Sequence, residues 1–145
     1  MKNAILLCLF ILLMTAACAK QDSNSPQGGW QMVQMQMNDK GKLTNYFSDR
    51  YVVNQTKMWD GNHFIFVGKY QVDTAITYRY GVGTWTLNGN IYEEDILYHF
   101  DKTYEGRKNK IWLEIKNDTL LHIFPVNDQG VPASTHWIER YVKLK

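Results

Sequence analysis

Residues 83–94 read GTWTLNGNIYEE, and this stretch decides the fold class. One strand-forming segment with Trp85 ends at Asn88-Gly89, and a second begins at Ile91. Asn-Gly tolerates the positive backbone angles of a two-residue turn, which makes it a strong mark of a β-hairpin. The stretch therefore predicts two short antiparallel strands joined by a tight turn.

Two further hairpins have the same pattern. Their turns and flanking strands are Asp60-Gly61 between residues 57–59 and 63–67, and Asn117-Asp118 between residues 111–115 and 120–124. Other strands are expected at residues 30–37, 51–54, 78–82 and 136–143. From Gly28 onward, apolar residues do not recur at helical spacing, so short strands dominate.

The pattern predicts an all-β domain of about eight to ten strands. Successive antiparallel strands must close into a barrel or a sandwich to protect their edges. Because the hairpins follow one another without a long crossover, we predict a single antiparallel up-and-down β-barrel over residues 28–145.

Composition excludes two other classes of protein. The chain has 145 residues, of which 14% are aromatic, with 16 Lys+Arg against 14 Asp+Glu. This even balance, without a Lys/Arg run, argues against a nucleic-acid binder. The aromatic content argues against intrinsic disorder.

The start of the chain predicts export. Lys2 is followed by an apolar run, residues 4–14, that ends in small residues. The run is shorter than the roughly 20 residues that cross a bilayer as a helix. It fits a secretory signal peptide over residues 1–17, the alternative being a retained N-terminal anchor.

Cys18 is the expected first residue of the mature protein. Residues 15–18, TAAC, resemble a bacterial lipobox, in which small residues precede a lipidated cysteine, although Thr15 stands where leucine is usual. The alternative is ordinary cleavage after Ala19. No cysteine follows Cys18, so Cys18 has no partner in the exported domain with which it could form a disulfide.

Residues 18–27 are polar and are expected to form a flexible tether. Together with a lipid on Cys18, they predict a lipoprotein of the cell envelope. We expect it to be anchored in the outer membrane, on its periplasmic or surface face, and the sequence favours no particular oligomeric state.

Three motifs resemble those of bacterial secreted lipocalin-like domains. They are Gly28-Gly29-Trp30, which looks like the Gly-x-Trp opening of lipocalins, the GTWTLNGNIYEE stretch, and WIER at residues 137–140. The resemblance covers about residues 28–144. It implies that Trp30 packs against Arg140 and closes one end of the barrel. No helix is expected after the last strand, which favours the lipocalin-like relatives over true lipocalins.

Glu94 is the first candidate site residue. Alternation along residues 92–100 places it on one face with Tyr92, Ile96, Tyr98 and Phe100, and we expect this face to line the interior. A buried carboxylate needs a partner. Glu94 is then either a polar anchor for a ligand, beside Tyr92 and Tyr98, or a structural partner of an interior Arg, Tyr or Trp.

Arg140 is the second candidate. It shares a face with Ile138, Val142 and Leu144, which predicts burial. Stacking on Trp30 would be a cation–π contact. The alternatives are pairing with Glu94 or a bidentate grip on a ligand carboxylate.

No catalytic or metal-binding motif is present. The four histidines, His63, His99, His122 and His136, are scattered, and Ser48 and Ser134 lack a nucleophile elbow. We therefore expect no metal, no cofactor and no enzyme activity. Two hypotheses follow: a barrel that holds a small apolar or lipid-like ligand, or a filled barrel that docks a protein or glycan through its outer surface.

Overall fold

The computed structural model describes residues 25–48 and 50–145. The predicted signal peptide, Cys18 and most of the predicted tether lie outside the described residues. The described chain forms one sheet of nine strands and a short 3-10 helix. The strands are β1 (Gly28–Asp39), β2 (Lys42–Asn45), β3 (Tyr51–Asp60), β4 (His63–Val72), β5 (Ala75–Asn88), β6 (Ile91–His99), β7 (Lys108–Lys116), β8 (Thr119–Val126) and β9 (Pro132–Lys143), with η1 (Lys102–Tyr104) after β6.

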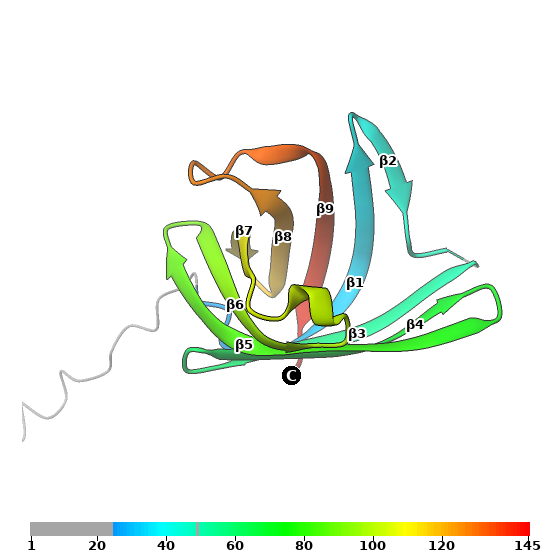
Figure 1. The fold of residues 1–145 in the computed structure, drawn as a ribbon, viewed down its shortest axis with the longest axis horizontal. Coiled ribbons are helices and arrows are strands. Elements are labelled where there is room, and N and C mark those ends of the chain that lie inside the picture. Colours follow the sequence, from blue (N-terminus) through cyan, green and yellow to red (C-terminus); the bar gives the residue numbers. More distant parts are fainter. Residues whose placement is uncertain (1–24, 49) are drawn as a thin grey trace, which may run out of the picture.

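The sheet closes into a barrel because β1 pairs with β9 as well as with β2 and β3. Every pair of strands is antiparallel, and β3 to β9 follow one another in sequence order. The closed barrel has eight strands, and β2 extends the sheet beside β1. In Figure 1, β3, β4 and β5 form the lower wall, and β7, β8, β9 and β1 arch above it. The predicted up-and-down barrel is thus confirmed.

The three predicted hairpins are present. Their first turn residues, Gly61, Gly89 and Asn117, have φ of 56, 60 and 55°, as a two-residue turn in a twisted hairpin requires. In the two glycine turns, Asp60 and Asn88 are the last paired strand residues, so each turn begins at the glycine.

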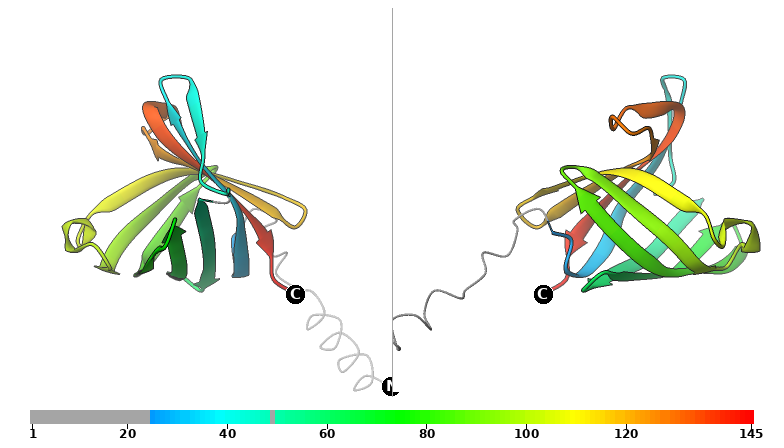
Figure 2. Two further views of the ribbon diagram at one scale, coloured as in Figure 1. Left: turned by 90° about the vertical axis from the view of Figure 1, so that its right-hand side faces the viewer. Right: turned by 60° about the vertical axis from the view of Figure 1, so that its left-hand side comes forward.

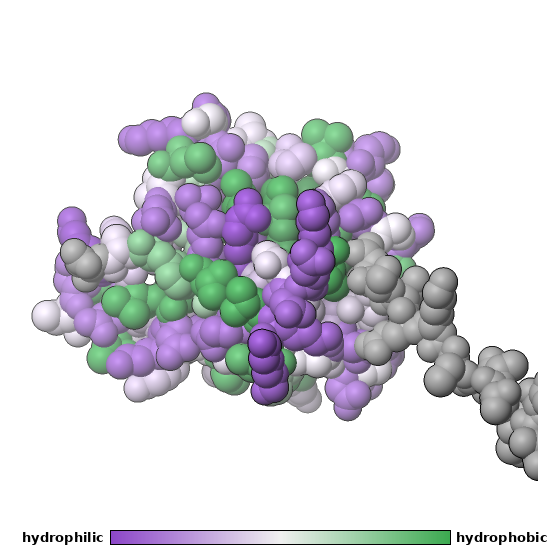
Figure 3. All heavy atoms as spheres, turned by 180° about the vertical axis from the view of Figure 1, so that it is seen from behind, coloured by the Kyte–Doolittle hydropathy of each residue, from purple (hydrophilic) through white to green (hydrophobic). Residues whose placement is uncertain are grey.

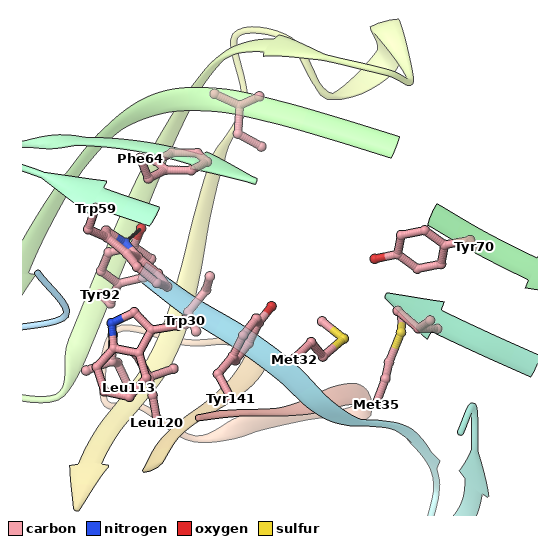
Figure 4. Packing of buried hydrophobic residues seen from close by; sticks show 13 residues of the cluster. Trp30, Met32, Met35, Trp59, Phe64, Tyr70, Tyr92, Leu113, Leu120 and Tyr141 are labelled. Carbon is pink, nitrogen blue, oxygen red and sulfur yellow. Dashed lines mark hydrogen bonds between the residues drawn. The ribbon is translucent and has the colours of Figure 1, made fainter. Parts of the chain in front are cut away.

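One end of the barrel is filled by apolar side chains. Trp30, Trp59, Tyr92, Leu113 and Leu120 are each at most 2% exposed and pack together there. Figure 4 shows this group gathered on one side, with Tyr70 and Met35 apart from it. This closed end holds Trp30, Trp59 and Tyr92, three of the largest fully buried side chains of the described residues.

The packed domain begins before the predicted boundary at residue 28. Pro26 is fully buried, and its carbonyl accepts a 2.7 Å hydrogen bond from Trp30 Nε1. The side chain of Gln27 donates a 2.7 Å bond to the carbonyl of Gly61 in the β3–β4 turn. Residues 26 and 27 are therefore part of the closed end and not of a tether.

The opposite end of the barrel is splayed. β1 pairs with β3 only over Gly28–Gln31 and then with β2 from Gln36. β6 pairs with β7 only over Ile91–Asp95, and η1 follows the end of β6 that pairs with β5 alone. Figure 2 shows the β1–β2 hairpin and the η1 segment projecting from the barrel. Short pairing on both sides leaves this end open.

Candidate functional site

The barrel contains a cavity of about 370 Å³ toward its open end. Side chains from all eight barrel strands line it. The polar ones among them are Gln55, Lys57, Tyr70, Arg79, Glu94, His99, Asp101, Tyr104, Asn109, His122 and Glu139. Small-molecule sites occupy about 300–1,000 Å³, and an eight-stranded barrel has room for one small ligand. The volume and the converging polar groups fit such a site.

Lys57 and Glu94 form a buried ion pair at the inner end of the cavity. Each residue is 4% exposed, and Lys57 Nζ donates to Glu94 Oε1. The same oxygen accepts a 3.0 Å bond from the hydroxyl of Tyr92, which in turn accepts a 2.7 Å bond from Trp59 Nε1. These bonds supply the partners that a buried carboxylate requires.

Aromatic rings surround the ammonium group of Lys57. Its Nζ lies 5.0 Å from the centre of the Phe64 ring and 5.8 Å from that of Phe66. Gly81 makes room for Phe66, because a Cβ there would lie 2.3 Å from the ring. The ion pair is thus held in an aromatic shell that favours the cation.

A second hydrogen-bonded chain crosses the barrel from β4 to β9. Tyr70 donates to Gln55 Oε1, and Gln55 Nε2 donates a 2.8 Å bond to the Tyr141 hydroxyl. Tyr141 donates a 2.7 Å bond to Glu139 Oε2. Burial, and then the charge of Glu139, raise the pKa values of Tyr70 and Tyr141 above the ordinary range, so both phenols remain donors at neutral pH.

His122 lies in the same interior without a hydrogen bond. Its side chain is fully buried, it lines the cavity, and neither ring nitrogen has a partner among the described residues. The ring stacks on Tyr92, with centres 5.6 Å apart. Nδ1 is 3.8 Å from Glu139 Oε2, too far for a strong bond. Burial lowers the pKa of His122, which keeps the imidazole neutral at pH 7.

The state of His122 predicts a loss of stability in mild acid. Its pKa is lowered in the folded protein, so below an unfolded value of about 6.5 the unfolded chain binds more protons than the folded one. The free energy of unfolding should therefore decrease as the pH is lowered, by at most about 1.4 kcal/mol per pH unit from this group. Urea melts from about pH 7.5 to about pH 5.5 measure the slope. His122→Phe should flatten it, and an unchanged slope in this variant would contradict the assignment.

Arg79 stands near the open end of the cavity. Its guanidinium group lies 4.2 Å from the centre of the Tyr70 ring and 5.2 Å from that of Phe100. Among residues 25–48 and 50–145, no carboxylate forms an ion pair with it. Arg79 is thus held by stacking on aromatic rings, and its N–H donors remain available to a ligand.

The predicted orientation of Glu94 is confirmed, and that of Tyr98 is wrong. Glu94 and Tyr92 face the interior, whereas Tyr98 is 63% exposed. The β5–β6 register jumps from Gly83↔Ile96 to Val82↔Tyr98, so Leu97 is an extra residue on β6. This bulge reverses the alternation after Ile96 and turns His99 inward in place of Tyr98. Phe100, directly after β6, is partly exposed and lines the cavity beside Arg79.

The predicted contact between Trp30 and Arg140 is also wrong. Arg140 is exposed on the outer wall, opposite Gln34 in the β1–β9 register. Trp30 is opposite Lys143, whose Nζ lies 5.5 Å from the Trp30 ring centre. A cation does cover the closing tryptophan, but it is a lysine three residues further along the chain. Arg140 pairs with neither Glu94 nor anything inside the barrel.

The inner face of β9 explains this error. Trp137, Glu139 and Tyr141 point inward, and the more apolar set with Ile138 and Val142 points outward. Hydrophobicity therefore selects the wrong face of the strand. Lys57 and Gln55 escape prediction for the same reason. Their spacing of two residues from each other and from Val53 and Trp59 nevertheless places all four on the inner face of β3.

The described histidines do not converge. His99 and His122 are buried, His63 is exposed, and none of the described residues belongs to a group of three or more His, Cys, Asp or Glu that could hold a metal. Within the part of the chain that the structure describes, no helix has the length and apolar character to cross a membrane. No protein-family model and no curated protein matches the chain.

Proposed function

We propose that this protein is a non-catalytic binding protein that holds one small molecule inside its barrel. The observation that carries the proposal is the cavity of about 370 Å³, in which buried polar groups converge among aromatic side chains. Four of these polar groups bond to one another in pairs, Lys57 to Glu94 and Tyr70 to Gln55. Such mutual engagement fits a preformed pocket better than a reaction centre.

The lining favours a compact amphipathic molecule over a long lipid chain. The inner end of the cavity holds the Lys57–Glu94 ion pair, and the walls hold Phe66, Phe124 and Trp137. A long alkyl chain would have to end against the ion pair. An aromatic or short aliphatic body with a polar group matches this combination.

A blocked cavity tests the proposal. Asn109 lines the cavity from β7, so Asn109→Trp should fill it. We expect the neutral dye N-phenylnaphthylamine to gain fluorescence on binding the wild type and to lose at least tenfold in affinity for Asn109→Trp. Val67→Trp, on the exposed side of β4, is the matched control and should bind like wild type. Equal binding by all three proteins would place the dye outside the barrel and overturn the proposal.

The membrane attachment is part of the same proposal. We propose that Cys18 carries the lipid that anchors the domain in the cell envelope, as TAAC and the absence of later cysteines support. Intact-mass spectrometry of the membrane fraction should find a chain that begins at Cys18 with a diacyl or triacyl adduct. Cys18→Ser should abolish the adduct. A soluble mature form that begins at Lys20 would contradict lipidation.

The second candidate function is docking through the outer wall, and one observation favours it. Apolar side chains lie side by side on the outer wall across β3 to β6, where exposed Met58, Ile65 and Tyr98 and half-buried Val82 are opposite one another in register. The surface in Figure 3 shows hydrophobic residues interspersed with hydrophilic ones. A barrel that docked only by this wall would not need the cavity, so we favour the interior site.

A further inference from the structure

The charged groups that line the cavity do not balance. Two of them are cations, Lys57 and Arg79, and three are carboxylates, Glu94, Asp101 and Glu139. Lys57 is committed to Glu94. Asp101 lies at the rim, where its side chain caps η1 by bonds to Thr103. Glu139 therefore stands as the interior carboxylate without a cation.

Glu139 retains an unused acceptor. It is 7% exposed, and Tyr141 bonds to its Oε2. Within residues 25–48 and 50–145, nothing donates to its other oxygen, Oε1. A buried carboxylate with one hydrogen bond and no counter-charge is costly unless a donor or a cation joins it.

His122 cannot supply that charge at neutral pH. It is opposite Glu139 in the β8–β9 register, and both of its ring nitrogens are buried without a partner. A neutral imidazole offers one donor and one acceptor. Beside a neutral His122, the unused oxygen of Glu139 has no counter-charge, so this level of the barrel matches a ligand group that carries N–H donors.

The next inward-facing pair toward the open end is aromatic. Trp137 and Phe124 are opposite each other in the same register, and both line the cavity. Aromatic faces attract a nearby cation, and tryptophan does so most strongly. The wall formed by Glu139, His122, Trp137 and Phe124 therefore favours positive charge by two independent means.

We propose that the ligand carries a positively charged amine, which binds at the wall formed by Glu139, His122, Trp137 and Phe124. This inference rests on the proposed function and names the chemical class of the ligand. The ammonium group would donate to Glu139 Oε1, with its carbon skeleton against Trp137 and Phe124. Arg79, at the rim, is a cation without a carboxylate partner among the described residues, so binding of an acidic ligand is the alternative that the experiment must exclude.

Three probes that share a phenethyl group separate these outcomes by isothermal titration calorimetry. They are phenethylamine, which is cationic, phenethyl alcohol, which is neutral, and hydrocinnamate, which is anionic. We expect phenethylamine to bind the wild type at least about tenfold more tightly than the alcohol, the gain typical of a charge-assisted bond. Hydrocinnamate should bind most weakly.

A substitution that removes the charge of Glu139 but keeps its shape locates the amine. Glu139→Gln keeps an acceptor for Tyr141 and should reduce phenethylamine affinity by about tenfold while changing that of the alcohol less than about twofold. Glu114→Gln removes an exposed carboxylate of β7 and is the matched control, expected to bind as wild type does. If Glu139→Gln does not fold, the selectivity of the wild type among the three probes still decides the question.

The contradicting outcomes are distinct from failure of the proposed function. Tightest binding by hydrocinnamate, lost in Arg79→Gln, would overturn the amine and assign the cavity to an acid. Equal affinity for all three probes would also overturn it, although the cavity would still be a binding site. If neither these probes nor N-phenylnaphthylamine binds, the proposed function itself fails.

Discussion

Removing one partner of the buried ion pair should be the most damaging single change in this barrel. Lys57→Met strands the carboxylate of Glu94, and Glu94→Gln strands the ammonium group of Lys57, each at 4% exposure. We expect each to lower the free energy of unfolding by about 3–5 kcal/mol, because an unpaired buried charge remains. Urea denaturation at neutral pH measures the loss.

The double variant is the decisive control. Lys57→Met with Glu94→Gln removes both charges and leaves an amide that can still accept from Tyr92. Its stability should lie closer to wild type than that of either single variant, since charge desolvation no longer applies. A double variant whose loss equals the sum of the two single losses would show that the pair is not coupled.

Gly83→Ala should lower the free energy of unfolding by about 3 kcal/mol, the upper part of the range for overpacking. A Cβ at Gly83 would lie 2.1 Å from the carbonyl oxygen of Asp95 on the neighbouring strand and 2.8 Å from the Phe64 ring. The oxygen belongs to the backbone of the β5–β6 pair, next to the bulge, and cannot rotate away.

Gly29→Ala is the matched control for this change. Gly29 also lies in a barrel strand, but its Cβ would meet the flexible side chain of Leu144 at 3.2 Å. We expect a change of less than about 1 kcal/mol for it. Similar thermal melts for the two alanine variants would contradict the tight approach of β5 and β6 at Gly83.

The fold could be predicted because the local signals are complete within short segments. Gly61, Gly89 and Asn117 begin turns that are predicted by the dipeptides in which they occur. Hairpins without crossovers leave few ways to close a sheet. Trp30 was correctly expected at the closed end. Its cation was misplaced, because the strand register that brings Lys143 over it is a property of the closed barrel.

The site was less predictable because its residues meet only after closure. Glu94 could be placed by alternation, since no bulge precedes it on β6. Tyr98 could not, since the extra residue Leu97 arises where two strands approach at Gly83 and leaves no mark in the periodicity. Glu139 was hidden for another reason: a polar interior inverts the rule that the apolar face of a strand is the inner one.

Methyl NMR with N-phenylnaphthylamine tests the central claim, ligand binding inside the barrel, most directly. Ile96 and Ile111 line the cavity, whereas Ile65 and Ile76 are exposed on the outer wall. The same residue type thus reports on both surfaces within one labelled sample. Saturable shifts of the Ile96 and Ile111 methyl resonances, with those of Ile65 and Ile76 unmoved, are the predicted result. Shifts confined to Ile65 and Ile76 would contradict an interior site.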